Sequence, residues 1–293
     1  MPIDMLIQNV HYLCRNQGGC RHLQKVLEQY PQKSIDFYEQ LHDKIFDLSL
    51  DSFGNYFIQK LLEYLPINLL TTIFVESFAK DFLSLCVSPH GTRVIQKFLD
   101  RVHNHSEIMN LFNPFFFNHL NDIILDSNAT HIVIKYFNLI KYPKNEYLLM
   151  FFKKNILMLS TNKHSCCTVQ KCIEAITNHH QLYEMINSIA KISHLLFNDQ
   201  YGNYIVQYSL GFNITELNSL IIKKYYSNID TFAYQKIASN VFEKCLQYSS
   251  PQERTSIIQY LCDKEIIRKL LLNTYGNYSK LYLYIYINII KYL

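Results

Sequence analysis

One motif recurs along the whole chain at a nearly constant spacing. The stretch DSFGNYFIQKLLE, at residues 51–63, is one of eight recognisable copies of the motif. Aligned on Asn55, the other copies centre on Cys20, Thr92, Thr130, Cys166, Asn203, Ser239 and Asn277. Neighbouring copies lie roughly 36 residues apart, and repetition with such a period is typical of proteins that stack small structural units in a row.

Each copy also has the periodicity of a helix. At about 100° per residue, Asn55, Tyr56 and Gln59 fall on one side of the helix. The apolar residues fall on the other side, as Phe57, Ile58, Leu61 and Leu62. The motif therefore predicts a helix that packs with one face and presents the sites of Asn55, Tyr56 and Gln59. We call these sites positions 1, 2 and 5 of each motif copy, and the following site position 6.

The segments around the motif predict two further helices in each repeat. Shorter apolar segments precede the motif, as at Lys44–Leu50, Leu120–Leu125 and Ile266–Leu272, and a third short helix is expected after it. Gly54, Gly91 and Gly202 stand directly before position 1, which fits a tight turn or a close approach between neighbours. Residues 281–293 alternate like a strand, but the repeat phase makes them the end of the last helix.

The sequences GNYFIQ, HGTRVIQ, GNYIVQ and ASNVFEKC resemble the repeat motifs of the Pumilio (PUF) family of RNA-binding proteins. The resemblance implies an all-α protein, a right-handed α-solenoid in the form of a crescent, with the motif helices along its concave side. It also implies a single Pumilio homology domain over residues 1–293. Its eight three-helix repeats would span approximately 3–40, 41–77, 78–115, 116–151, 152–188, 189–224, 225–262 and 263–293.

The residue types at positions 1, 2 and 5 suit an unstacked nucleobase. Two polar groups match the Watson–Crick edge of a base, and a flat or cationic side chain covers its face. The predicted base-edge residues are Cys20, Gln24, Asn55, Gln59, Thr92, Gln96, Thr130, Cys166, Gln170, Asn203, Gln207, Ser239, Glu243 and Asn277. The predicted stacking residues are Arg21, Tyr56, Arg93, His131, Tyr204, Asn240 and Tyr278.

Position 6 is a lysine in six copies. These residues are Lys25, Lys60, Lys97, Lys135, Lys171 and Lys244. A row of ammonium groups beside the base-edge residues suits the phosphate backbone of a nucleic acid. The alternative is that they are solvated helix faces with no partner, but their regular spacing favours the RNA interpretation.

The resemblance also implies which base each copy reads. In the family, the pair at positions 1 and 5 selects the base. Asn with Gln reads uracil; Cys, Ser or Thr with Gln reads adenine; and Ser with Glu reads guanine. The RNA runs antiparallel to the chain. Carried over, the copies imply a site close to 5′-UGUAnAUA-3′. Ile134 and Leu281 replace the expected Gln in the fourth and eighth copies, so their base preference stays open, and Cys167 cannot stack as Arg would.

The resemblance implies a regulatory role on messenger RNA. We expect a monomer that binds single-stranded elements in 3′ untranslated regions and promotes translational repression or decay, with deadenylase or repressor proteins on the convex face. Two other classes stay open. One is a protein-interaction solenoid of the HEAT or armadillo kind, and the other is a ribosome-assembly relative that binds RNA without base selection.

Composition excludes some other classes. The net charge of +4 permits a polyanionic partner without requiring one. The sequence contains no catalytic motif and no CxxC pair, so we expect neither an enzyme nor a bound cofactor or metal. Cys166, Cys167 and Cys172 lie near His164 in the sequence, and we interpret them as ordinary thiols. No apolar run reaches the roughly 18 residues of a membrane span. Without a signal-peptide pattern, we expect a reducing, cytoplasmic location.

Overall fold

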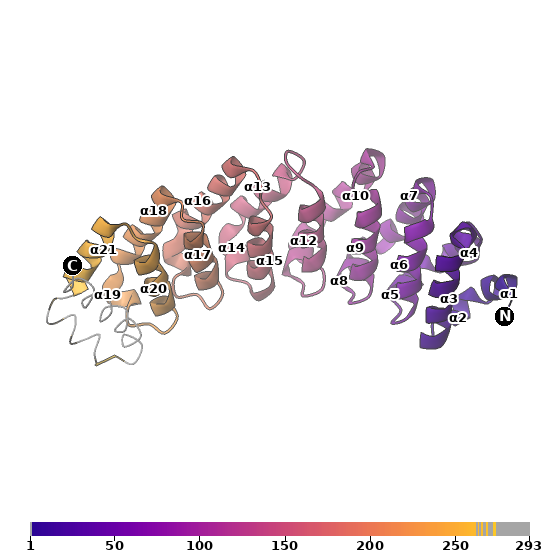
Figure 1. Cartoon of the computed structure of the whole chain (residues 1–293), viewed down its shortest axis with the longest axis horizontal. Coiled ribbons are helices and arrows are strands. Elements are labelled where there is room, and N and C mark those ends of the chain that lie inside the picture. Colours follow the sequence, from indigo (N-terminus) through magenta and orange to yellow (C-terminus); the bar gives the residue numbers. More distant parts are fainter. Residues whose placement is uncertain (1, 262, 264, 266–267, 269–271, 274–293) are drawn as a thin grey trace. The chain divides into compact units, whose positions relative to one another are not determined.

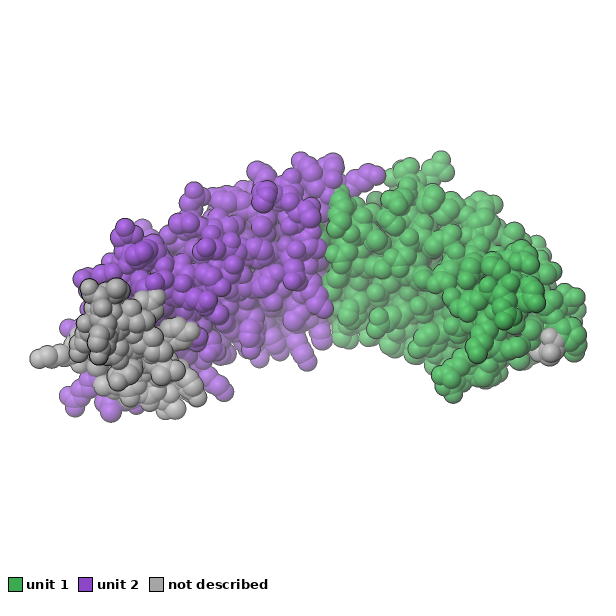
Figure 2. All heavy atoms as spheres, viewed as in Figure 1, with its two compact units in different colours: residues 1–141 green, residues 142–293 purple. Residues whose placement is uncertain are grey.

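The computed structural model describes residues 2–261, 263, 265, 268 and 272–273. These residues form helices joined by short connections, and none of them lies in a strand. The chain divides into two compact units, Met1–Lys141 and Tyr142–Leu293, which are coloured separately in Figure 2. The predictions for Asn277, Tyr278, Leu281 and the last helix, and most of the helix predicted at residues 266–272, lie outside the described residues.

The first unit stacks four motif helices. They are α3 (Gln17–Gln29), α6 (Gly54–Tyr64), α9 (Gly91–Val102) and α12 (Thr130–Leu139). Figure 1 shows them side by side, and each packs against the next. The other helices of the unit are α1 (Ile3–Gln8), α2 (Val10–Leu13), α4 (Ser34–Leu41), α5 (Ile45–Leu50), α7 (Ile67–Glu76), α8 (Phe82–Val87), α10 (Ser106–Asn118) and α11 (Leu120–Leu125), with the short 3₁₀ turns η1 (Pro31–Lys33), η2 (His42–Lys44) and η3 (Phe78–Asp81).

The second unit repeats this arrangement. Its motif helices are α15 (Lys163–Glu174), α17 (Gly202–Gly211) and α20 (Ala238–Tyr248). They alternate with α13 (Glu146–Lys154), α14 (Ile156–Ser160), α16 (His179–Leu196), α18 (Thr215–Tyr226), α19 (Ile229–Phe232) and α21 (Pro251–Leu261). The sequence predicts a repeat boundary near residue 188, and the 18-residue helix α16 runs across that position.

The cores of both units consist of the apolar faces that the motif predicts. Phe57, Ile58, Leu61 and Leu62 are each at most 1% exposed, and so are their counterparts Val94, Ile95, Phe98 and Leu99. Around Phe98, the rings of Phe74, Phe78 and Phe112 lie with centroids 5.5–6.3 Å away. Burying such rings is the main stabilising term between stacked helices. The all-α repeat fold predicted from the sequence is confirmed.

A side chain closes the turn before most motif helices. Asp51, four residues before position 1, accepts hydrogen bonds from the amides of Phe53 and Gly54 at 2.9 and 2.7 Å. The corresponding residues Asn16, Ser88, Asp126, Asn162 and Asp199 also accept hydrogen bonds from amides two or three residues ahead. In the seventh copy this residue is Gln235, whose buried Oε1 has no hydrogen-bond partner among the described residues. Its side chain is one methylene longer than that of Asn, which removes the short-range geometry of an Asx turn.

The glycines before position 1 let two helices of one repeat approach closely. A Cβ atom on Gly91 would lie 2.3 Å from the carbonyl oxygen of Leu85, and one on Gly54 would lie 2.8 Å from that of Leu48. Both carbonyls belong to the short helix that precedes the motif helix in the same repeat. The close approach expected from the sequence is therefore present, within each repeat rather than between neighbouring ones.

Candidate nucleic-acid interface

The three sites of the motif differ sharply in exposure. Position 1 is buried in all seven described copies, as Cys20, Asn55, Thr92, Thr130, Cys166, Asn203 and Ser239. Position 2 is exposed in all seven, and position 5 is half-buried. Asn55 is 2% exposed and Tyr56 is 56% exposed, for example. The sequence predicts that all three are presented on one face, but the structure buries the first and leaves the second as the outer edge of the site.

In the second copy, hydrogen bonds hold the Asn–Gln pair in one orientation. The Nδ2 group of Asn55 donates to the carbonyls of Asp51 and Ser52 at 2.8 and 3.1 Å, which turns Oδ1 toward position 5. Gln59 Nε2 then donates to Asn55 Oδ1 at 2.9 Å. This leaves one N–H and the Oε1 of Gln59, together with a lone pair on Asn55 Oδ1, for an outside partner.

The sixth copy has the same network. Asn203 Nδ2 donates to the carbonyls of Asp199 and Gln200 at 2.9 and 3.2 Å, and Gln207 Nε2 donates to Asn203 Oδ1 at 2.8 Å. Because the second and sixth copies belong to different units, the agreement follows from the motif itself. Each pair presents a fixed sequence of donors and acceptors, which is what selection of one base edge requires.

Copies with Cys or Thr at position 1 and Gln at position 5 use a different partner, a carbonyl of the next copy. Cys20 Sγ donates to the carbonyl of Phe53 at 3.1 Å, Thr92 Oγ1 to that of Asn128 at 3.1 Å, and Cys166 Sγ to that of Tyr201 at 3.3 Å. Each carbonyl stands two residues before position 1 of the next copy. The position 1 side chain therefore also links neighbouring repeats, which the sequence alone does not indicate.

Position 5 completes these pairs. The amide nitrogens of Gln24, Gln96 and Gln170 donate to the sulfur or hydroxyl oxygen at position 1, at 3.3, 3.4 and 3.3 Å. Burial raises the pKa of the Cys166 thiol to about 11 and also raises the pKa of Cys20 above its usual value. Both thiols therefore remain neutral hydrogen-bonding groups near pH 7 rather than reactive thiolates.

The fourth and seventh copies differ from these pairs. Thr130 Oγ1 donates to the carbonyl of Ser127 at 3.4 Å, and its neighbour at position 5 is the apolar, half-buried Ile134. Ser239 Oγ donates to the carbonyl of Lys236 at 3.0 Å, beside the half-buried Glu243. The fourth copy thus offers one polar group, and the seventh offers a hydroxyl beside a carboxylate.

A hollow of about 400 Å³ lies between the first two motif helices. Its lining residues are Gln17, Cys20, Arg21, Gln24, Ser52, Phe53 and Tyr56. Arg21 and Tyr56 are the position 2 side chains of successive copies, so a guanidinium plane and a phenol ring border a space that also contains the Cys20–Gln24 pair. A planar, polar-edged ring such as a nucleobase matches this combination.

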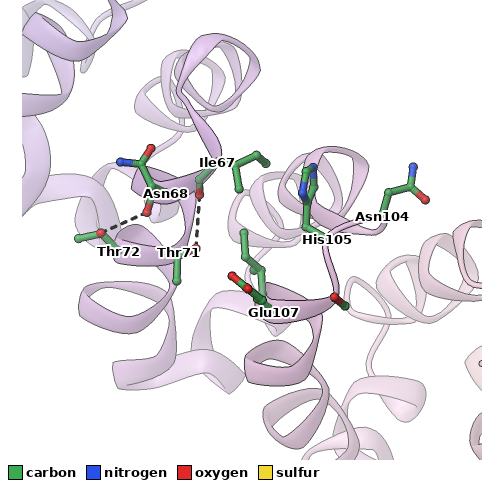
Figure 3. Close-up of a pocket in the computed structure, with 9 residues that line it drawn as sticks. Ile67, Asn68, Thr71, Thr72, Asn104, His105 and Glu107 are labelled. Atoms are coloured by element: carbon green, nitrogen blue, oxygen red, sulfur yellow. Dashed lines mark hydrogen bonds between the residues drawn. The ribbon is translucent and has the colours of Figure 1, made fainter.

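Another hollow, of about 630 Å³, lies where α7 and α10 begin (Figure 3). Its lining residues are Ile67, Asn68, Thr71, Thr72, Asn104, His105, Ser106, Glu107 and Ile108. The hydroxyls of Thr71 and Thr72 donate back to carbonyls of α7 at 3.3 Å each, and no motif residue borders the space. This hollow is therefore separate from the interface.

Three of the position 6 lysines form ion pairs with acidic residues. Lys60 Nζ lies 2.8 Å from a carboxylate oxygen of Glu28 and 2.9 Å from one of Glu63, and Lys97 Nζ lies 2.5 Å from Glu63. Lys135 Nζ lies 2.6 Å from a carboxylate oxygen of Asp100. The predicted contact of these lysines with a phosphate backbone stays a prediction, because the structure gives them a different partner.

The ion pairs shift the pKa values of their members. Hydrogen bonds to Glu28 and Glu63 raise the pKa of Lys60. Burial of Glu63 acts to raise its pKa, but the hydrogen bonds and charges of Lys97 and Lys60 outweigh burial and lower it. Lys60 and Glu63 are therefore fully charged at neutral pH.

The cysteines near His164 do not form a common site. Cys172 is buried among apolar residues, Cys166 makes the contacts given above and Cys167 is exposed. In the part of the chain that the structure describes, no three His, Cys, Asp or Glu residues are placed to hold a metal ion. No helix in that part combines the length and the apolar character needed to cross a bilayer.

Comparison with known families supports the interpretation of the motif. The family model of the Pumilio-family RNA binding repeat matches residues 9–36, 44–76, 81–113, 155–190, 198–223 and 228–262. These segments contain positions 1, 2 and 5 of the first, second, third, fifth, sixth and seventh copies. The fourth copy, with Thr130 and Ile134, falls between two matched segments.

Curated proteins and solved structures resemble the chain over most of its length. A Pumilio domain-containing protein of Schizosaccharomyces pombe, C6G9.14, is 30% identical over 92% of this chain and 39% of its own length. Pumilio homolog 12 of Arabidopsis thaliana is 29% identical over 92% of this chain and 45% of its own length. The chain thus spans less than half the length of these relatives.

Two of the similar solved structures contain RNA. The Puf4 RNA-binding domain, bound to a recognition sequence from the 3′ untranslated region of HO endonuclease RNA, matches with a TM-score of 0.80 and 26% identity. The match covers 91% of this chain and 83% of that domain. The RNA-binding domain of yeast Puf5p, bound to AAT2 RNA, matches with a TM-score of 0.76 and 26% identity, over 95% of this chain and 83% of that one.

Proposed function

Because this chain belongs to the Pumilio family of RNA-binding repeat proteins, we propose that it binds single-stranded RNA with base selection. The observation that carries the proposal is the repeated arrangement at positions 1, 2 and 5. A buried polar group, an exposed flat or charged group and a half-buried polar group recur on the described motif helices with two exceptions, Ile134 at position 5 and Cys167 at position 2. Family membership also places the chain among binding proteins and not among enzymes.

The arrangement suits one base per repeat. The exposed side chain at position 2 offers a surface for stacking, which contributes roughly 1–3 kcal/mol per base in single-strand recognition. The pair at positions 1 and 5 offers hydrogen bonds to the base edge. Because hydrogen bonds such as Gln59–Asn55 already orient the pair, little further ordering is needed when a base arrives.

The expected target is close to 5′-UGUAnAUA-3′. The Asn–Gln pairs at Asn55 and Asn203 are expected to select uracil, and the Cys–Gln and Thr–Gln pairs adenine. Ser239 with Glu243 is expected to select guanine, because a carboxylate accepts from both N1–H and N2–H₂ of that base. The fourth copy is expected to tolerate several bases.

The proposal is tested by competition binding with oligonucleotides. A labelled RNA containing UGUAAAUA is displaced by unlabelled competitors with the same sequence or with a scrambled sequence of equal composition. We expect the scrambled RNA to compete at least tenfold less well. Equal competition would support a relative that binds RNA without base selection, and no binding of either RNA would support a protein-interaction solenoid.

The cellular role that fits this target is post-transcriptional. We propose that the protein acts in the cytoplasm on 3′ untranslated regions and lowers translation or shortens transcript lifetime by recruiting deadenylase or repressor proteins. A reporter transcript with the intact element should be expressed less than one in which UGU is changed to ACA. Equal expression of the two reporters would contradict this role without affecting the proposed RNA binding.

A further inference from the structure

The ion pairs of the motif lysines join the same two motif positions in successive copies. Each paired lysine stands at position 6 of its copy and contacts the acid at position 9, three residues after position 6, of the preceding copy. Lys60 also contacts Glu63, the acid at position 9 of its own copy. The partners in this register are Glu28 with Lys60, Glu63 with Lys97, and Asp100 with Lys135, with nitrogen–oxygen distances of 2.8, 2.5 and 2.6 Å. All six residues belong to the first unit, where these pairs join successive motif helices.

The other three lysines at position 6 lack this acid. Position 9 of the preceding copy is Asn138 for Lys171 and Gly211 for Lys244. Lys25 belongs to the first copy and is exposed. Among the described residues, no carboxylate of the same unit forms an ion pair with any of the three lysines. Lys244 Nζ instead donates to the neutral amide oxygen of Gln247 at 2.8 Å.

A paired and an unpaired lysine differ in what they offer a phosphate group. A phosphate that approaches Lys135 must displace Asp100 and leave that carboxylate without its cation, so the pair has little net charge to offer. Lys25 and Lys171 are exposed and carry their whole charge into the solvent beside the motif helix. Phosphate binding by such a group releases condensed counterions and is favourable at moderate salt.

We propose that the lysines at position 6 divide into two functional classes. Lys25, Lys171 and Lys244 bind the RNA backbone, whereas Lys60, Lys97 and Lys135 hold neighbouring repeats together. This inference rests on the proposed RNA-binding function and states which lysines contact the RNA. It differs from the sequence prediction, which treats all six as backbone contacts.

One acid at position 9 has no lysine at position 6 of the next copy. Glu174 stands at position 9 of the fifth copy, but position 6 of the sixth copy is Tyr208 instead of a lysine. A phenol is neutral or anionic and never cationic, so Tyr208 cannot balance the carboxylate; burial and the charge of Glu174 raise its pKa and keep it neutral. Glu174 is exposed and is therefore expected to repel the backbone.

The salt dependence of RNA affinity tests the assignment. For single strands, the logarithm of affinity falls with the logarithm of salt concentration with a slope of about −0.7 per phosphate neutralised. Lys171→Gln and Lys244→Gln are each expected to make the slope shallower by about 0.7. The double variant Lys135→Gln/Asp100→Asn removes a whole ion pair, keeps the net charge, and is expected to leave the slope unchanged.

Two further variants complete the experiment. Lys154→Gln removes an exposed charge from the end of α13, away from the motif helices, and controls for net charge alone. Glu174→Gln is expected to strengthen binding at low salt, because it removes a repulsion. Circular dichroism melting of each variant confirms that it is folded before its slope is compared.

The outcomes separate the inference from the function that it assumes. Selective binding by the unaltered protein, with equal loss of slope in Lys171→Gln and Lys135→Gln/Asp100→Asn, would overturn the division and keep the function. An unchanged slope in both Lys171→Gln and Lys244→Gln would also overturn it. Equal affinity of the unaltered protein for target and scrambled RNA would instead contradict the proposed base selection, whatever the slopes.

Discussion

Gln59 Nε2 donates a 2.9 Å hydrogen bond to Asn55 Oδ1, across one turn of the same helix. The bond joins the buried Asn55 side chain and the half-buried Gln59 side chain into one recognition unit. Both hydrogens of the Asn55 amide are already used by carbonyls of the preceding turn, so the direction of the Gln59–Asn55 bond cannot reverse. A unit with fixed donors and acceptors discriminates between bases because a wrong base leaves buried groups unpaired.

The fourth copy lacks this unit, and restoring it is predicted to create selectivity. Ile134→Gln places an amide one turn from the Thr130 hydroxyl, as in the Thr92–Gln96 pair, whose nitrogen–oxygen distance is 3.4 Å. We expect a preference for adenine of about tenfold at the unspecified base of UGUAnAUA, from a hydrogen bond worth about 1.4 kcal/mol. Competition between four RNAs that differ only at this base measures it. Equal affinities for all four would contradict the prediction.

The carboxylate of the seventh copy is predicted to select guanine. Glu243→Gln replaces an oxygen that accepts a hydrogen bond with a nitrogen that donates one. We expect the affinity for the UGU-containing target to fall by about 5- to 150-fold, corresponding to a loss of 1–3 kcal/mol for one bidentate contact. Competition with RNA that carries adenine at this site should show a relaxed or reversed preference. An unchanged preference for guanine would show that the assignment of this repeat is wrong.

The exposed tyrosine of the sixth copy is predicted to contribute affinity through its ring. Tyr204 is 60% exposed beside the Asn203–Gln207 pair. Tyr204→Ala is expected to lower RNA affinity by about 1–3 kcal/mol with little change in melting temperature, because the side chain makes few contacts in the free protein. Tyr204→Phe retains the ring and serves as the matched control. Equal losses in the two variants would argue against stacking.

The glycine before the third motif is predicted to be essential for stability. In Gly91→Ala, the new Cβ would lie 2.3 Å from the carbonyl oxygen of Leu85, and backbone atoms cannot move aside cheaply. We expect a loss of about 1–3 kcal/mol in the free energy of unfolding, from the strain of an overpacked site. Gly18→Ala is the control, because its nearest neighbour is a side-chain atom at 3.9 Å. Urea denaturation should leave that variant unchanged or slightly stabilised.

The ion pair between Lys97 and Glu63 is predicted to stabilise the first unit in a pH-dependent manner. The lysines lower the folded pKa of Glu63 below its ordinary value of 4.5. Its contribution is therefore fully present above that value and is lost as the pH falls through the lowered one. Lys97→Met is expected to cost about 0.5–1 kcal/mol at pH 7 and almost nothing at pH 3. Urea denaturation at both pH values measures this, and an equal deficit at both would contradict it.

Much of the fold and of the candidate site follows from local patterns in the chain. The period of the motif specifies the stacking of similar units, and the helical spacing separates Phe57 and Ile58 from Asn55 and Gln59. The short helices predicted at Lys44–Leu50 and Leu120–Leu125 are observed as α5 and α11 within one residue. These features are predictable because they depend on residues one or two turns apart in the same helix. The relative positions of such residues are the same in every α-helix.

The stacking of the repeats decides the remaining features. Burial of Cys20, its hydrogen bond to the carbonyl of Phe53, and the pairing of Lys135 with Asp100 all require a neighbouring repeat at the correct distance. A helical wheel places each of these side chains on the outer face, because it contains no information about what the next helix covers. The chain alone thus specifies which residues face outward together, and the packing between repeats determines which of them remain available to a ligand.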